Sequence, residues 1–247
     1  MPRTKSSTTP KRLPKAAEIQ KELAKLSNPA RAKFSLRYFK TAPGQYGAHD
    51  VFRGIPGPVI WQMESRYRDA PLAEVQKLIR SQYHEDRGLA LLLLCRIYSR
   101  SDARTRKQVF NFYLRSTKHI NNWDLVDSSA PHIVGAYLYE TNWKLLLKLS
   151  QSPNLWRRRI SILATFHFIR NDDFEPALTV AERLLNDPED LIHKAVGWML
   201  REIGKRSPQT ERRFLRKHYR KMPRTMLRYA IERFPEPERQ RYLHGLV

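Results

Sequence analysis

Two side chains that could take part in chemistry lie four residues apart in the segment Asn121–Asp127, namely Trp123 and Asp127. Residues four apart lie on the same face of a helix, so an indole ring and a carboxylate would project from one spot. The chain carries a formal net charge of +22. In so basic a chain, a carboxylate beside an aromatic ring suggests a site for a cationic group.

The excess of 46 Lys+Arg over 24 Asp+Glu favours a polyanionic partner, most often nucleic acid. No stretch approaches the roughly 20 uninterrupted apolar residues of a membrane span, and no signal-peptide pattern opens the chain. The single cysteine excludes a disulfide framework and a thiolate-based zinc site. With only 9 glycines and no Walker or Rossmann pattern, the chain offers no phosphate-cradling loop. We expect neither a metal nor a cofactor.

The chain divides into a basic tail and a helical remainder. Residues 1–15 place five Lys and Arg residues among Ser, Thr and Pro, which predicts disorder. The tail either attracts phosphates independently of sequence or only keeps the chain in solution, and both alternatives stay open. Residues 16–247 follow a helical pattern without convincing period-two strands, which predicts one all-α domain. One helix is expected to span 123–139.

Residues 41–58 form the one long irregular loop of the predicted fold. Loops of this length are often functional, and its Tyr46, Phe52 and Arg53 are candidates for contacts with a ligand. The favoured interpretation is that these side chains instead pack the loop against the rest of the protein.

Three helical segments repeat a basic start followed by small and apolar residues, at a spacing that fits a period of about 35. They are Arg87–Leu92, Arg158–Leu163 and His193–Trp198. Stacked repeats place equivalent helices side by side on a concave wall. Such a wall would bring Trp123, Asp127, Arg159 and Trp198 together, with Arg158 and Lys194 beside them, and would be electropositive with a single acidic spot.

A tryptophan-lined pocket with one carboxylate suits hydrolysis of the N-glycosidic bond of an alkylated purine. Asp127 would stabilise the positive charge that develops on the sugar and activate water. Trp123 and Trp198 would hold the cationic base, and Arg159, Arg158 and Lys194 would bind phosphates. Two alternatives stay open: the indoles could be core residues, and Asp127 could form a salt bridge with Arg159 or Lys194.

At these residues the chain resembles the bacterial AlkD-type DNA alkylation repair glycosylases, which are built from HEAT-like repeats. The resemblance covers about residues 30 to 235 and rests on four motifs: the Phe52–Ile55 turn, Trp123–Asp127, Trp156–Leu163 and Ile192–Glu202. It implies a right-handed α–α superhelix of HEAT/ARM-like repeats with a concave DNA-binding groove. It also implies an amino-terminal aromatic contact, for which Tyr46 and Phe52 are candidates.

The resemblance further implies removal of 3-methyladenine and 7-methylguanine from duplex DNA, without metal or cofactor and without a deep base pocket. Asp127 matches the family's catalytic aspartate, Trp123 and Trp198 its indoles, and Arg159 its arginine beside the lesion. We therefore predict a base-excision-repair hydrolase that acts as a monomer on double-stranded DNA, away from membranes, in the nucleoid-associated cytoplasm. The alternative is a non-catalytic HEAT-like protein that binds unusual DNA structures; a protein or RNA scaffold is weaker still.

Overall fold

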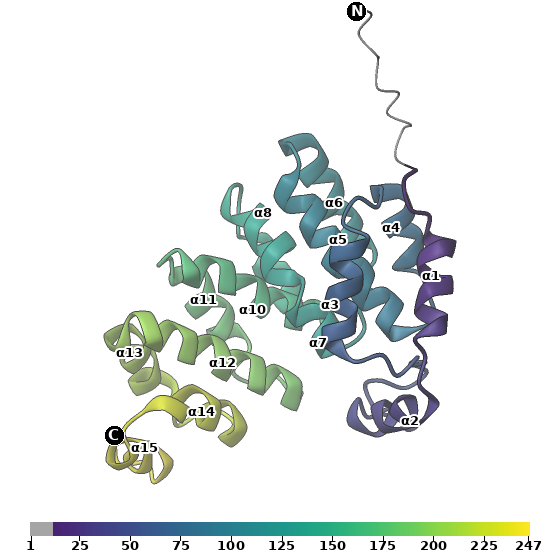
Figure 1. Cartoon of the computed structure of the whole chain (residues 1–247). Coiled ribbons are helices and arrows are strands. Elements are labelled where there is room, and N and C mark those ends of the chain that lie inside the picture. The colour runs from purple at the N-terminus through teal and green to yellow at the C-terminus, as the bar shows by residue number, and fades with distance from the viewer. Residues whose placement is uncertain (1–11) are drawn as a thin grey trace, which may run out of the picture.

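The structure is a computed structural model and describes residues 12–247. Helices follow one another in chain order along a curved array, from α1 at one end to α15 at the other (Figure 1). Within the described residues there is no strand, and the one extended pairing is an isolated bridge between Val51 and Tyr83. The predicted all-α fold is confirmed. The predicted tail, residues 1–15, lies mostly outside the described part.

The helices have the following bounds. They are α1 (Ala16–Lys25), α2 (Pro29–Tyr38), α3 (Gly57–Arg66), α4 (Leu72–Leu78), α5 (His84–Arg100), α6 (Ala103–Arg115), α7 (Trp123–Asp127), the π-helix η1 (Pro131–Gly135), α8 (Ala136–Tyr139), α9 (Leu145–Ser150), α10 (Leu155–Arg170), α11 (Glu175–Arg183), α12 (Asp190–Arg206), α13 (Pro208–His218), α14 (Arg224–Ala230), the 3₁₀-helix η2 (Ile231–Arg233) and α15 (Glu236–Leu243).

The helix predicted over 123–139 is wrong in one respect, because it is broken after Asp127. Pro131 has no N–H, and its ring would collide with the carbonyl of Asp127 in a continuous helix. Ser128 and Ser129 also donate their hydroxyls to the carbonyls of Asp124 (2.7 Å) and Leu125 (2.5 Å), which bends the chain. Asp127 is therefore the last residue of a short helix and not a residue of a helix interior.

Neighbouring helices bury one continuous apolar core that extends from Ala16 to Tyr242. α10 occupies its centre, packing against α7, η1, α9, α11 and α12, and α12 packs in turn against α14. Gly197 permits the close approach of α12 and α14, since a Cβ atom there would lie 2.4 Å from the carbonyl oxygen of Met226. The contacts of α7, α10, α12 and α14 carry the site described below.

Candidate active site

A cavity of 610 Å³ opens on the side where α7, α10, α12 and α14 follow one another. Of the predicted site residues it collects Trp123, Asp127, Arg159, Trp198, Lys194 and Tyr46. Its other lining residues are Tyr38, Lys40, Glu189, Asp190, Leu191, Arg201 and Tyr229. Residues as far apart in the sequence as Tyr38 and Tyr229 thus line one cavity.

Asp127 and Arg159, which both line this cavity, form a bidentate ion pair. Nε and Nη2 of Arg159 donate to the two carboxylate oxygens of Asp127 at 2.8 and 2.7 Å, and Nη1 donates to the carbonyl of Leu191. Arg159 is 5% exposed and Asp127 is 16% exposed. The salt bridge that the sequence left open is therefore present, and it presents the Asp127 carboxylate at the cavity wall.

Burial raises the pKa of Asp127 above its usual value, because the cavity floor is poorly solvated; the charge and hydrogen bonds of Arg159 oppose this shift. Arg159 also fixes the direction of the carboxylate. An arginine has five N–H donors, of which Arg159 uses three here, so two remain for another anion.

The two indoles of the cavity are held by their own neighbours. Trp123 stacks on Phe39, with ring centroids 5.6 Å apart, and meets the edge of Tyr38 at 6.0 Å. Trp198 donates its indole N–H to Glu202 at 2.9 Å and lies 6.0 Å from the ring of Phe166. Both rings are only half-buried, so part of each faces the cavity.

The sequence analysis missed two aromatic residues that line the cavity, Tyr229 on α14 and Tyr38. Tyr38 is 55% exposed and touches Trp123 from the end of α2. Nothing in the local pattern marks it, because α2 precedes the irregular loop and its neighbours are decided by how that loop folds back. Tyr46 of the loop also lines the cavity, where burial raises the pKa of its phenol.

Three other candidates lie outside the cavity. The guanidinium of Arg158 is held by Asp187 at 2.6 Å and by two backbone carbonyls at 3.0 and 3.1 Å. Arg53 is buried and pairs with Asp86 at 2.6 Å. Phe52 is buried against Phe39. For Arg53 and Phe52 the structure has the packing that the sequence favoured, whereas Arg158 pairs with Asp187 away from the cavity.

The expectation of a single acidic spot is also wrong. Glu189 and Asp190, at the start of α12, line the cavity together with Asp127. Asp190 accepts an ion pair from Lys194 at 2.7 Å, and this hydrogen bond raises the pKa of Lys194. The rim is therefore of mixed charge, which suits a cationic ligand flanked by phosphates.

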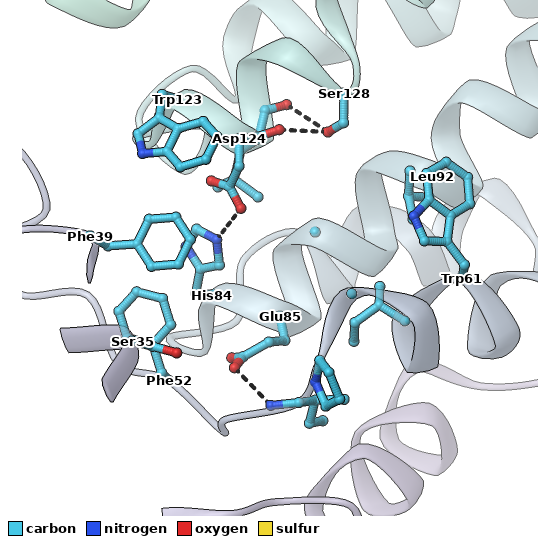
Figure 2. A pocket seen from close by; sticks show the side chains of 16 residues that line it. Ser35, Phe39, Phe52, Trp61, His84, Glu85, Leu92, Trp123, Asp124 and Ser128 are labelled. Atoms are coloured by element: carbon cyan, nitrogen blue, oxygen red, sulfur yellow. Dashed lines mark hydrogen bonds and ion pairs between the residues drawn. The ribbon is translucent and has the colours of Figure 1, made fainter. Parts of the chain in front are cut away.

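A second cavity, of 380 Å³, also has Trp123 in its lining (Figure 2). Phe39 and His84 line it on the side of Trp123, and Trp61 lies across from them. His84 is buried and bridges two carboxylates, with Nε2 2.7 Å from Asp124 and Nδ1 3.3 Å from Asp50. This bridge fastens the first turn of α7 to the end of the irregular loop.

The charges of this bridge stabilise one another. Burial disfavours the imidazolium, but the carboxylates of Asp124 and Asp50 raise the pKa of His84 to about 9. Burial likewise opposes ionisation of Asp50, yet His84 and Arg87 lower the pKa of its carboxyl to about 2. Asp50 also accepts from Asn121 and Asn122, both at 3.1 Å, just before Trp123. The start of α7 is thus pinned by buried charges.

Within residues 12–247, no three His, Cys, Asp or Glu side chains are grouped so that they could hold a metal ion. In the same part of the chain, every helix is too short or too polar to cross a bilayer.

Residues 19–234 match the model of a protein family described as DNA alkylation repair enzyme. The chain belongs to the DNA alkylation repair enzyme family. Membership gives it a role in the repair of alkylation damage and implies that it binds DNA. The predicted family is confirmed.

Solved structures similar to this family member share its fold. The "predicted DNA alkylation repair enzyme" of Enterococcus faecalis is 18% identical with a TM-score of 0.68, over 85% of this chain and 97% of that one. AlkD2 from Streptococcus mutans is 16% identical with a TM-score of 0.53, over 90% of this chain and 97% of that one. No match was found among curated proteins. At these identities the likeness establishes the helical-repeat architecture.

Proposed function

We propose that this member of the alkylation repair family is a DNA glycosylase that hydrolyses the N-glycosidic bond of cationic alkylated purines in duplex DNA, such as 3-methyladenine and 7-methylguanine. One observation carries the proposal. The Asp127 carboxylate, aimed by Arg159, lines the same 610 Å³ cavity as Trp123 and Trp198.

The reaction needs little from the protein besides that arrangement. Alkylation at N3 or N7 makes the purine cationic, so the base leaves with the electrons of the C1′–N bond and becomes neutral. The sugar then carries positive charge, which Asp127 stabilises. A water molecule adds to C1′ and gives its proton to Asp127. The carboxylate must be ionised to act, and pairing with Arg159 favours the ionised form.

Aromatic rings account for binding of the charged base. Trp123, Trp198 and Tyr38 line the cavity, and a cation over the face of such a ring gains about 0.5 to 2 kcal/mol. The added carboxylates of Glu189 and Asp190 increase the attraction for a positively charged lesion. Lys194, and the two N–H donors that Arg159 keeps free, are the groups proposed to contact phosphates beside it.

The test is release of methylated purine from an alkylated duplex by the natural protein and by Asp127→Asn. We expect release by the first and a loss of about a hundredfold or more in the second. DNA binding should be retained or improved, since a charge that repels phosphates is removed. Circular dichroism establishes that the variant is folded.

Glu189→Gln is the matched control, because Glu189 lines the same cavity but makes no ion pair with Arg159. Because Glu189 adds to the attraction for the charged base, this variant should bind the lesion slightly more weakly but release base from the bound duplex at the natural rate. If both variants slow release from the bound duplex equally, the summed negative charge of the cavity is what matters and Asp127 has no special role. If the natural protein binds damaged DNA but releases no base, the chain is a binding module and the glycosylase proposal is wrong.

A further inference from the structure

Helix α2 differs from the other long helices in that none of its ten residues is buried. Its ends are nevertheless fixed. Gly54, at φ 76°, lies so close to the first turn that a Cβ atom there would be 2.2 Å from the carbonyl oxygen of Asn28. Phe39, directly after the last turn, stacks on Phe52 with ring centroids 5.1 Å apart. α2 is therefore held firmly while one face of it stays uncovered.

Aromatic rings lie along that uncovered face. Phe34 is 68% exposed and Tyr38, one turn later, is 55% exposed. The two rings are nearly parallel, at 18° and 6.2 Å between centroids, and Tyr38 meets Trp123 inside the cavity. A row of rings thus leads from the proposed lesion site to the surface, where one face of Phe34 has no partner among the described residues.

Positive charge flanks these rings. Residues 29–40, which comprise α2 and the two residues after it, contain no carboxylate, and none of their four cations forms an ion pair within residues 12–247. These cations are Arg31, Lys33, Arg37 and Lys40. Lys33 and Arg37 are one turn apart on α2, so they form a stripe beside the stripe of Phe34 and Tyr38. Lys40 follows the end of the helix and lines the cavity. Exposed rings next to unpaired cations are the combination that binds bases and phosphates together.

We infer that the outer face of α2 is a nucleic-acid surface on which Phe34 stacks an unpaired base of the damaged duplex, while the cationic stripe holds the adjoining phosphates. The inference rests on the proposed function for the position of the lesion. Once the damaged base is released, the base opposite it in the duplex has no pairing partner. Phe34 offers that base an exposed ring one helical turn from Tyr38, which lines the cavity.

Stacking depends on a flat ring and not on apolar character alone. The test therefore compares an apolar side chain without a ring with an aromatic one at position 34. The ligand is a duplex with a tetrahydrofuran abasic analogue, on which no base can be released, and an undamaged duplex is the comparison. For Phe34→Leu we expect the Kd for the abasic duplex to rise about tenfold. The Kd for the undamaged duplex should change less than about twofold, and Phe34→Trp should restore binding. Phe34 is mostly exposed, so these variants should fold normally.

Leu36→Ala is the control, because Leu36 is also exposed on α2, at 40%, but has no ring. It should bind both duplexes as the natural protein does. A 5-iodouracil placed opposite the abasic analogue should cross-link on irradiation to Phe34, and this product should be lost in Phe34→Leu. The inference is overturned if Phe34→Leu binds the abasic duplex normally, if it weakens both duplexes equally, or if Leu36→Ala has the same effect.

The result is independent of base release. Cross-linking to Phe34 by a protein that releases no methylated purine would support the stacking surface and refute the glycosylase. Release of base with normal binding by Phe34→Leu would do the reverse.

Discussion

At the scale of single residues, the pair of Asp127 and Arg159 combines the two roles that the sequence left as alternatives. The arginine is buried and holds both carboxylate oxygens, so it is a structural partner. The same two bonds fix the carboxylate in the cavity that the indoles also line. An ion pair at this place does not argue against catalysis, because a carboxylate that stabilises a cation must itself be ionised and oriented.

Replacing Arg159 by Ala should therefore act through Asp127. Without the group that opposes the effect of burial, the pKa of Asp127 rises further, so the acidic limb of the pH–rate profile for base release should move to higher pH. The variant should also lose about 3 to 5 kcal/mol of stability, since a buried charge loses its partner. An acidic limb that stays in place would show that Arg159 does not govern the ionisation of Asp127.

The sequence could predict which residues meet in the cavity, but not how each one is bonded. Spacing along helices and repeats brought Trp123, Asp127, Arg159 and Trp198 to one wall. For the run of three arginines before Ile160, the sequence could not predict which one faces the cavity. Arg159 faces Asp127 whereas Arg158 faces Asp187, and this depends on the rotation of α10 against its neighbours.

At the scale of elements, α7 is the part on which the site depends most. It is five residues long, ends at Asp127, and is too short to be stable alone. Its position comes from α10 on one side and from the buried bridge of Asp50, His84 and Asp124 on the other. Its break after Asp127 follows from Pro131, a signal that was present in the sequence and was outweighed by the apolar periodicity on both sides.

The protein should lose stability at alkaline pH, because His84 then loses its proton. Its folded pKa of about 9 is higher than the usual 6.5, so its contribution is complete below pH 6.5 and is lost as pH rises through 9. The loss is at most about 3 kcal/mol. Urea unfolding at pH 6.5, 8 and 10 should show a smaller loss for His84→Gln than for the natural protein. Glu211, whose pKa burial raises to about 8, titrates in both proteins, so the difference isolates His84. Equal losses would mean that the bridge does not bear on stability.

Packing of α12 on α14 offers a second prediction at this scale. Gly197→Ala would place a Cβ atom 2.4 Å from the carbonyl oxygen of Met226 and 2.5 Å from Cβ of Tyr229. Separating the helices should cost about 1 to 3 kcal/mol in urea unfolding. Gly57→Ala is the matched control, because nothing lies within 4 Å of its Cβ position. Similar stability of the two variants would contradict the close packing.

At the scale of the whole molecule, helical periodicity was sufficient to predict the all-α fold. Period is the signal that both levels of the architecture share, 3.6 residues within a helix and about 35 between repeats. The path of residues 39–56 carries no period. Its folding, which brings Tyr38 and Tyr46 to the cavity, is decided by contacts between segments far apart in the chain, those of Asp50 with His84 and of Gly54 with Asn28.

The net charge of +22 should make DNA binding strongly dependent on salt. If six to ten phosphates are contacted, affinity for an undamaged duplex should fall by about 10³ to 10⁵ between 50 and 200 mM salt. Binding should be followed by fluorescence anisotropy. Lys194→Ala should lower the slope by about 1 if its ammonium contacts a phosphate. An unchanged slope would show that pairing with Asp190 keeps Lys194 from the DNA.

The central claim concerns Asp127, and single-turnover release of 7-methylguanine from a methylated duplex tests it most directly. The natural protein should release the base, and Asp127→Asn, folded and still bound to the DNA, should do so about a hundredfold more slowly or not at all. Release at the natural rate by Asp127→Asn would contradict the account, because the carboxylate that Arg159 orients would then have no part in the chemistry.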